Sequence, residues 1–144
     1  MPVSDKTAII TGAGSKRGIG RATAHALAAA GWNVAILDLD EASAKEAADE
    51  VAERRGVHTA GIGCDVTDEA SVESALAALD GSMPQVGAVI NNAGITSPTR
   101  FLDVTGEEWD RIFSVNVRGS YNITRRVAPT MVAALDWGKF LVTM

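Results

Sequence analysis

The sequence predicts an α/β fold in which a parallel sheet is covered by helices on both faces. Short apolar runs alternate with stretches of helical period, most of these runs are continuously apolar, and no long linker or low-complexity tract interrupts them. Continuous apolar strands are typical of parallel sheets, because both faces of the sheet are buried. Right-handed crossovers leave few topologies for such strands, and the doubly wound arrangement fits best.

The first half of the chain supplies two strand–helix pairs. KTAII at 6–10 is short, apolar and β-branched, and is expected to form a buried strand before a helix at 18–31 with small apolar side chains on one face. NVAILDLD at 33–40 predicts a second buried strand, which turns polar at its end. Strong helix formers fill 41–56, and Gly56 suits a helix end.

The second half repeats the alternation with three further strands and two further helices. The strands are expected at 58–66, 86–94 and 139–144. The helices are expected at 67–79 and from 107 to about 135. Thr67 is expected to be the N-cap of the first of these helices, because two acidic residues follow it and favour the helix dipole.

Composition and charge exclude several classes of protein. The 144 residues suit one domain, 1–144, and their formal net charge of −5 argues against a nucleic-acid partner, which needs a basic face. No apolar run has transmembrane length and the first residues lack the features of a signal peptide, so a cytoplasmic protein without a membrane partner is expected. Cys64 is the single cysteine, and neither a disulfide nor a metal site is expected.

The segment TGAGSKRGIG at 11–20 holds four glycines directly after an apolar strand and opens the next helix. The free N–H groups and the positive dipole end of such a helix form an anion site, whose usual occupant is a pyrophosphate. The strict G-x-G-x-x-G fingerprint is absent, because counting from Gly12 puts Arg17 where the third glycine would stand. A tight turn without a ligand is therefore the alternative interpretation.

Polar residues also follow the next three strands, at the edge where doubly wound sheets bind ligands. Asp38 lies 18 positions after Gly20, and a carboxylate there can accept hydrogen bonds from ribose hydroxyls and repels a 2′-phosphate; a surface carboxylate is the alternative. Asp65 either accepts from an adenine amino group or simply begins a turn. NNAG at 91–94 brings two amides and a flexible glycine to the middle of this edge.

Asn116 lies between Val115 and Val117 in an apolar stretch of helical period. A buried asparagine must find hydrogen-bond partners. It is therefore either a satisfied core amide or a polar group that faces a site, and both interpretations stay open. The preceding segment, 95–110, is a candidate for one wall of a substrate pocket.

Taken together, these residues resemble the N-terminal, cofactor-binding part of the short-chain dehydrogenase/reductase family. The matching pieces occur in the family's order and spacing across the whole chain: TG…GIG at 11–20, Asp38, CDV at 64–66, NNAG at 91–94 and VNVRGSYNITRRVAPTM at 115–131. The resemblance implies a Rossmann-type sheet and an NAD(P)-dependent oxidoreductase that transfers a hydride between nicotinamide and an alcohol or ketone. It also implies a homo-oligomer, either a dimer or a tetramer.

The resemblance further implies roles for single residues. Those implied to bind the cofactor follow the strands in turn: Gly12, Ser15, Gly18, Ile19, Gly20, Asp38, Leu39, Asp65, Val66, Asn92, Ala93 and Gly94. The loop residues would surround the pyrophosphate, the next pair the adenosine ribose, the following pair the adenine, and the last three the cofactor further along. Asn116 would match the family's catalytic asparagine, which holds a water used in proton relay.

The glycine loop departs from the family pattern. Five residues separate Gly12 from Gly18 where the family usually has three, so the turn must bulge, and Lys16 and Arg17 could project toward the adenosine end of the cofactor. A basic residue there often accompanies a 2′-phosphate and keeps NADP open. A carboxylate beside the ribose hydroxyls is the more direct determinant, since it repels a phosphate at short range, and Asp38 therefore favours NAD.

The family's active-site serine, tyrosine and lysine come after the fifth strand, whereas this sequence reaches only Met144. The C-terminal part of the family fold is therefore expected to be missing. Tyr121 is followed four positions later by Arg125 instead of a lysine, and is assigned to structure. The expected function is that of a family enzyme whose natural chain continues past Met144. The alternative is a catalytically inactive dinucleotide-binding fragment or interaction module.

Overall fold

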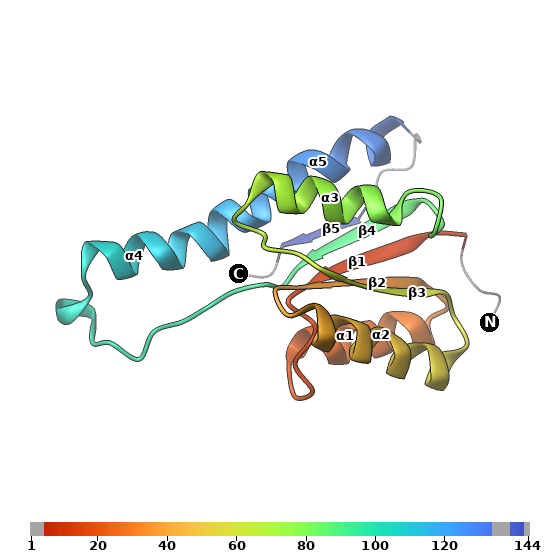
Figure 1. The fold of residues 1–144 in the computed structure, drawn as a ribbon, viewed down its shortest axis with the longest axis horizontal. Coiled ribbons are helices and arrows are strands. Elements are labelled where there is room, and N and C mark those ends of the chain that lie inside the picture. The colour runs from red at the N-terminus through yellow and green to blue at the C-terminus, as the bar shows by residue number, and fades with distance from the viewer. Residues whose placement is uncertain (1–4, 134–138, 143–144) are drawn as a thin grey trace.

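Five parallel strands form one sheet in the computed structural model of the chain, which describes residues 5–133 and 139–142 (Figure 1). The strands stand in the order β3-β2-β1-β4-β5, and every neighbouring pair is parallel. Their bounds are β1 (Thr7–Thr11), β2 (Asn33–Asp38), β3 (Thr59–Gly63), β4 (Val86–Asn91) and β5 (Lys139–Val142). This order confirms the α/β fold that the sequence predicts. The chain builds the sheet outward from β1 to β3 on one side and then continues with β4 on the other side of β1, and doubly wound sheets bind ligands at this switch point.

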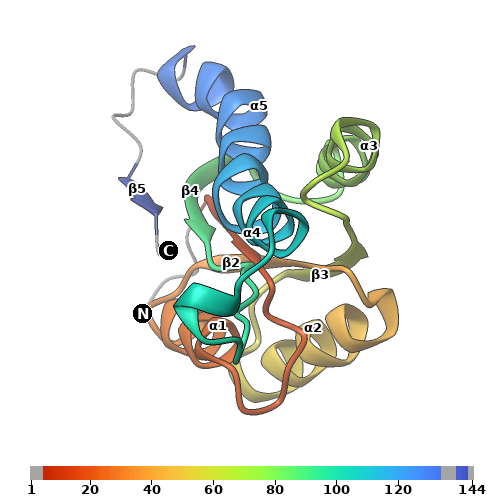
Figure 2. The same ribbon diagram turned by 90° about the vertical axis from the view of Figure 1, so that its left-hand side faces the viewer.

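Helices cover both faces of the sheet. Figure 2 shows α1 and α2 on one side, with α3 and α5 on the other. The helix bounds are α1 (Ile19–Ala29), α2 (Glu41–Arg55), α3 (Glu69–Leu79), α4 (Gly106–Phe113) and α5 (Gly119–Ala133). A single 3₁₀ turn at Phe101–Asp103 precedes α4, which projects away from the sheet (Figure 1). None of the helices in the described part of the chain is long and apolar enough to cross a bilayer.

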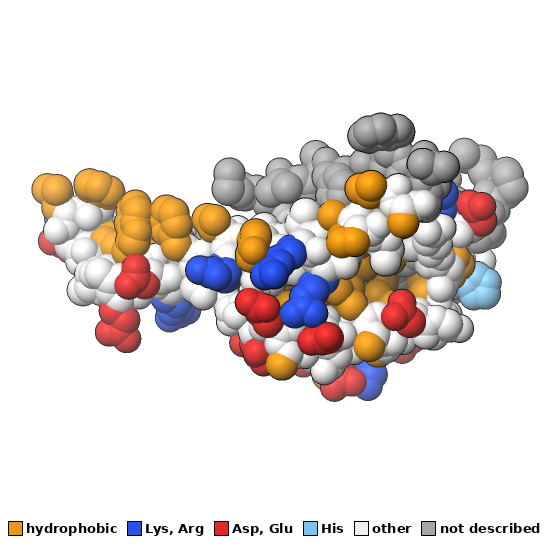
Figure 3. Space-filling view, turned by 90° about the horizontal axis from the view of Figure 1, so that it is seen from above, with side chains coloured by type: hydrophobic (Ala, Val, Ile, Leu, Met, Phe, Trp, Pro, Cys, Tyr) orange, Lys and Arg blue, Asp and Glu red, His pale blue; other side chains and the backbone are white. Residues whose placement is uncertain are grey.

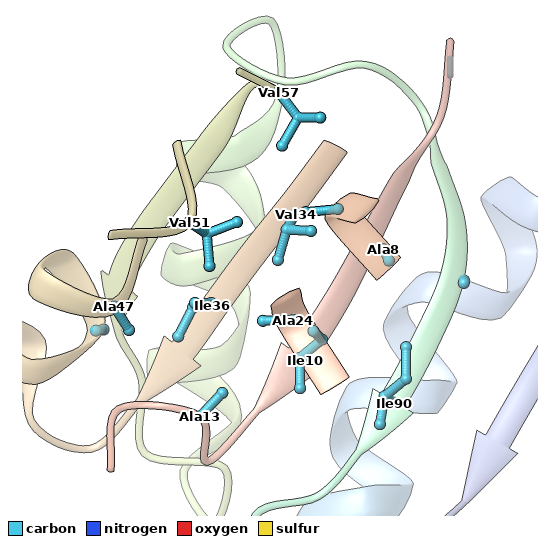
Figure 4. Packing of buried hydrophobic residues seen from close by; sticks show 13 residues of the cluster. Ala8, Ile10, Ala13, Ala24, Val34, Ile36, Ala47, Val51, Val57 and Ile90 are labelled. Carbon is cyan, nitrogen blue, oxygen red and sulfur yellow. The ribbon is translucent and has the colours of Figure 1, made fainter. Parts of the chain in front are cut away.

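Alternate residues of the strands enter two separate cores. In β1, Ala8 and Ile10 pack among the alanine and valine side chains of α1 and α2 (Figure 4), whereas Ile9 points to the core under α3 and α5. The small side chains let α2 approach the sheet very closely. A Cβ added to Gly61 of β3 would lie 2.3 Å from the carbonyl oxygen of Ala44, so the helix rests almost directly on the strand.

Three of the strands end earlier than the sequence predicts, whereas β1 ends one residue later, at Thr11 instead of Ile10. β2 ends at Asp38 instead of residue 40, β3 at Gly63 instead of 66, and β4 at Asn91 instead of 94. Cys64 still donates to the carbonyl of Asp38 at 2.8 Å, but several of the residues beyond these ends make side-chain hydrogen bonds in place of ladder bonds. Asp40, for example, is the N-cap of α2, and its Oδ1 accepts from the N–H of Ala42 at 3.0 Å.

The N-cap of α3 is Asp68, so the prediction of Thr67 is wrong by one residue. Asp68 Oδ1 accepts a hydrogen bond from the N–H of Ala70 at 3.1 Å. Thr67 is held instead by Asp65, whose Oδ1 accepts from the backbone N–H of Thr67 at 2.9 Å and from its hydroxyl at 2.7 Å. The helix therefore begins one residue later than expected.

The long helix expected from residue 107 is divided into α4 and α5 by a π-helical turn at Ser114–Arg118. At the end of this turn the N–H of Gly119 donates to the carbonyl of Ser114, five residues earlier. A π-helical turn inside an α-helix is frequent at functional sites. The expected continuations of this helix after 133 and of the last strand after 142 lie outside the described residues.

Candidate functional site

The carboxyl ends of β1, β2, β3 and β4 surround a hollow of about 270 Å³. Of the residues expected to bind a cofactor, those lining this hollow are Gly12, Asp38, Leu39, Asp65, Val66, Ala93 and Gly94. Ser15, Gly18, Ile19, Gly20 and Asn92 are not among its lining residues. The sequence pattern gave no cofactor-binding role to the residues that complete the wall, which are Leu37, Cys64, Thr67, Ile95 and Val115.

Hydrogen bonds lock the ends of β1 and β4 together. Asn92 Nδ2 donates to the carbonyl oxygens of Thr11 and Gly12, both at 2.9 Å. In return the Thr11 hydroxyl oxygen accepts from the backbone N–H groups of Asn92 at 3.1 Å and Ala93 at 3.0 Å. Asn92 thus braces the base of the glycine loop, while Thr11 is a site residue that the sequence analysis missed. It opens the glycine segment at 11–20, but nothing in that pattern gave its hydroxyl a role.

Two glycines allow backbone contacts that a side chain would prevent. Gly12 has a φ of +66°, and a Cβ there would lie 2.6 Å from the Cα of Ala93. Gly20, in the first turn of α1, would place a Cβ 2.6 Å from Asn92 Nδ2. The backbone of the loop at Gly12 therefore lies against that of Ala93, and the first turn of α1 lies against the Asn92 side chain.

The N-terminus of α1 opens onto the loop with free hydrogen-bond donors. Gly18 is its N-cap, no side chain caps the helix, and its first turn holds no acidic residue. Ser15 closes the turn, because its carbonyl accepts from the N–H of Gly18 at 3.2 Å. Ile19 is 77% exposed. Backbone donors and the positive end of the helix dipole together favour an anion at this point.

The Asp38 carboxylate is held by backbone donors on two sides. Its Oδ2 accepts from the N–H of Gly14 at 2.8 Å, and its Oδ1 accepts from the N–H of Asp40 at 3.1 Å. The basic residue Lys16 points elsewhere, since its ammonium lies 2.8 Å from Glu46 Oε1 on α2. The end of β2 therefore presents a fixed negative charge at the hollow.

The turn after β3 is fixed against α5. Asp65 accepts from Thr67 through Oδ1, and its N–H donates to the Ser71 hydroxyl at 2.9 Å. The carbonyl of Val66 accepts from Asn122 Nδ2 at 2.9 Å. Burial raises the pKa of the neighbouring Cys64 thiol to about 11, so this thiol is protonated and inert at neutral pH.

Asn116 lies in the π-helical turn and contacts the segment that leaves β4. Its Oδ1 accepts from the N–H of Ile95 at 2.8 Å, and its Nδ2 donates to the carbonyl of Ile95 at 3.0 Å. This pair of bonds imitates a strand pairing and fixes Ile95, which lines the hollow. Asn116 is partly buried. The amide of Asn116 is thus satisfied by the backbone of Ile95, and its role at a site stays a prediction.

A second hollow of about 520 Å³ adjoins the first and shares Gly94 and Ile95 with it. Its apolar wall includes Trp109 and Phe113 of α4, whose rings stack with centroids 4.6 Å apart. The segment 95–110, a candidate for a substrate wall, supplies most of its lining. Glu108 ties this segment to α4, because its Oε1 accepts from the hydroxyls of Ser97 and Thr99. These hydrogen bonds lower the pKa of the Glu108 carboxyl.

No group of three or more His, Cys, Asp or Glu side chains is placed to hold a metal ion in the part of the chain that the structure describes. Backbone donors, carboxylates and amides gather at this edge of the sheet. A glycine loop between β1 and an uncapped helix, with a carboxylate at the end of β2, defines a Rossmann-type α/β protein.

The chain belongs to the short-chain dehydrogenase family, whose sequence model matches residues 6–143. It is 44% identical over 132 residues to an uncharacterized short-chain type dehydrogenase/reductase of Sinorhizobium fredii. It is 36% identical over 141 residues to a sorbitol dehydrogenase of Cereibacter sphaeroides. These matches cover 91% and 98% of this chain but 52% and 53% of the relatives. The chain thus spans about half the length of the curated relatives it matches.

Solved structures agree with this family. A 3-ketoacyl-(acyl-carrier-protein) reductase from Brucella melitensis, complexed with NADH, superposes with a TM-score of 0.82 at 36% identity, over 94% of this chain and 55% of that one. An L-sorbose reductase from Gluconobacter frateurii, complexed with NADPH and L-sorbose, superposes with a TM-score of 0.82 at 27% identity, over 92% of this chain and 50% of that one. The family expectation is confirmed, and the two neighbours carry different dinucleotides.

Proposed function

We propose that this chain binds NAD at the carboxyl edge of its sheet, and that the intact protein transfers a hydride between nicotinamide and an alcohol or ketone. The observation that carries the proposal is the Asp38 carboxylate, which lines the hollow and is held by the N–H of Gly14. Membership of a dehydrogenase family supports the reaction type. Residues 1–144 would form a single dinucleotide-binding domain.

The glycine loop fits a pyrophosphate. Gly12 and Gly20 let the loop and the start of α1 pack closely against Ala93 and Asn92, which fixes the shape of the loop. The uncapped start of α1 offers N–H donors to an anion. The residues assigned to the phosphates and their loop are Gly12, Ser15, Gly18, Ile19 and Gly20.

The adenosine half fits the hollow between the ends of β2 and β3. Asp38, flanked by the exposed Leu39, would accept hydrogen bonds from the two ribose hydroxyls. Asp65 and Val66 would border the adenine. Because Thr67 already engages Asp65 Oδ1, we assign the adenine amino group to Asp65 Oδ2.

The nicotinamide half would follow the line of Asn92, Ala93 and Gly94 toward the second hollow. A bound nicotinamide dinucleotide supplies the carbon that gives or takes the hydride. Asn116 would act here in two ways, by fixing Ile95 through its amide and by holding a water for proton relay. The second hollow, with its stacked aromatic rings, would receive the small-molecule substrate.

The charges around the adenosine end favour NAD over NADP. The ammonium of Lys16 is paired with Glu46, whereas the Asp38 carboxylate is fixed at the hollow. A 2′-phosphate would meet that carboxylate at short range and be repelled. Arg17 is exposed in the same loop and is the cation that keeps NADP open.

A homo-oligomer and a cytoplasmic location belong to the same proposal. Trp109, Phe113, Val117 and Tyr121 recur every four residues from α4 into α5, and each is about half exposed. Figure 3 shows hydrophobic side chains gathered along the projecting arm of the molecule. An exposed apolar row of this kind is typical of a protein–protein contact surface. A second copy of the chain would cover it.

Calorimetric titration of the intact protein with NAD and with NADP tests the cofactor proposal. We expect NAD to bind at least about tenfold more tightly, because one repelled phosphate is worth more than about 1.4 kcal/mol at short range. If neither dinucleotide binds, the cofactor proposal fails and the alternative of an interaction module remains. Tighter binding of NADP would mean that the positive charge of Arg17, and not the negative charge of Asp38, decides which dinucleotide binds.

A further inference from the structure

The side chain of Arg21 is buried beneath the glycine loop, although it carries a positive charge. Arg21 lies in the first turns of α1 and is only 3% exposed. Burying a charge is unfavourable unless the charge is paired and hydrogen-bonded. The position therefore needs an explanation beyond helix packing, for which an apolar side chain would serve.

The two amino groups of the Arg21 guanidinium make contacts in different directions. Nη1 donates to Glu50 Oε2 on α2 at 2.8 Å, which compensates the charge. Nη2 donates to the carbonyl oxygen of Gly14 in the loop. The planar guanidinium suits this task, because its donors diverge from a rigid plane. Arg21 thus ties the bulged part of the loop to α2.

Gly14 is the residue that also holds Asp38. Its carbonyl is fixed by Arg21, and its own N–H donates to Asp38 Oδ2 at 2.8 Å. There is no room for it to shift inward, since a Cβ on Gly14 would lie 2.9 Å from both Asp38 Oδ2 and the Cβ of Ser43. A continuous series of contacts therefore runs from Glu50 through Arg21 and Gly14 to Asp38.

We propose that Arg21 is a positioning residue for dinucleotide selection. By fixing the Gly14 carbonyl, Arg21 sets the loop conformation in which Gly14 holds the Asp38 carboxylate at the hollow. The inference rests on the proposed function, because Asp38 is the group that would select between a ribose hydroxyl and a 2′-phosphate. Arg21 itself lies behind the loop and acts on the ligand only through Gly14 and Asp38.

The test compares three variants of the intact protein. Arg21→Gln removes the charge and the reach to both partners. Arg21→Lys keeps the charge for Glu50 but replaces the planar fork by a single ammonium, which cannot hold Glu50 and Gly14 in the same way. Arg54→Gln is the matched control, because Arg54 Nη2 also pairs with Glu50, at 3.0 Å, but its side chain is 65% exposed.

The decisive quantity is the ratio of the dissociation constants for NADP and NAD, measured by calorimetry beside the melting temperature. We expect the ratio to fall about tenfold in Arg21→Gln, because a factor of ten is roughly the effect of one hydrogen bond to a charged group. The ratio should fall by less in Arg21→Lys. The ratio should stay unchanged in Arg54→Gln. Binding of NAD should weaken and binding of NADP should weaken less, because a displaced Asp38 also repels the phosphate less.

Two results would overturn the inference, and they differ from a failure of the proposed function. If both Arg21 variants lower the melting temperature but keep the ratio, Arg21 only packs α1 against α2. If Arg21→Gln does not fold, Arg21→Lys decides alone, and an unchanged ratio in that variant rejects the inference. If the unsubstituted protein binds neither dinucleotide, the proposed function itself fails before Arg21 is tested.

Discussion

The N–H of Gly14 donates a hydrogen bond to the carboxylate of Asp38, 24 positions further along the chain. This bond joins the glycine loop after β1 to the end of β2. The loop and the carboxylate therefore form one rigid unit, in which backbone donors for an anion and an acceptor for hydroxyls have a fixed separation. A dinucleotide combines these groups in one molecule, which is why this relationship points to that ligand class.

Removal of the Asp38 charge is expected to change cofactor preference. In Asp38→Asn the amide repels a phosphate less and accepts hydrogen bonds less strongly, so NAD should bind about tenfold more weakly and the preference over NADP should largely disappear. Asp40→Asn is the matched control, because Asp40 caps α2 and does not line the hollow. A preference that shifts equally in both variants would show that only the general negative charge matters.

The positive φ of Gly12 matters more for stability than that of Gly56, because only Gly12 is crowded. Both residues have φ near +67°, but a Cβ on Gly12 would meet the backbone of Ala93 at 2.6 Å, whereas nothing lies within 4 Å of one on Gly56. We expect Gly56→Ala to lower the free energy of unfolding by about 1 kcal/mol. Gly12→Ala should lower it by about 3 kcal/mol. Denaturant unfolding measures both, and equal losses would contradict the close approach.

Truncation of Asn116 should loosen the segment after β4. In Asn116→Ala the N–H and carbonyl of Ile95 lose their side-chain partners. The free energy of local opening at this segment should therefore fall by about 1–3 kcal/mol. Hydrogen exchange at the Ile95 amide should accelerate by roughly tenfold or more, while the amides of β1 exchange as before. Unchanged exchange at Ile95 would mean that the loop is held by other contacts.

The Glu50 carboxylate should make stability depend on pH in the acid range. Burial acts to raise the pKa of Glu50, but the hydrogen bond from Arg21 and the charge of Arg54 outweigh it and hold the pKa below its ordinary value of 4.5. A carboxyl with a lowered folded pKa stabilises the fold above its unfolded pKa and loses that contribution as the pH falls through the folded value.

Comparison of the unsubstituted protein with Glu50→Gln isolates this effect. The difference in unfolding free energy should be constant above about pH 5 and should shrink as the pH falls below that of the unfolded carboxyl. A difference that grows on acidification would mean that burial, and not Arg21, dominates the carboxyl.

The sequence predicts the layers of this fold because its apolar period is clear. The apolar run of β1 and the alanine-rich faces of α1 and α2 indicate a buried strand between helices, and the structure has that arrangement. Asp38 was also found from its place after a strand, since parallel strands bring their carboxyl ends to one edge.

Other features depend on contacts between distant residues, which no local pattern shows. The Thr11 hydroxyl acts through Asn92, 81 positions away, and Arg21 reads in the sequence as an ordinary helix residue. The π-helical turn arises where Asn116 binds the backbone of Ile95. The error at Thr67 has a nearer cause, because Asp65 competes for its hydroxyl and N–H.

A crystal structure of the intact protein grown with NAD tests the central claim most directly. We expect the adenosine ribose hydroxyls within hydrogen-bond distance of the Asp38 carboxylate and the pyrophosphate against the backbone between Gly12 and Gly20. Such a structure would join the glycine loop, Asp38 and the hollow in one binding site. NAD bound away from this edge, for example in the groove between α3 and α5, would contradict the account.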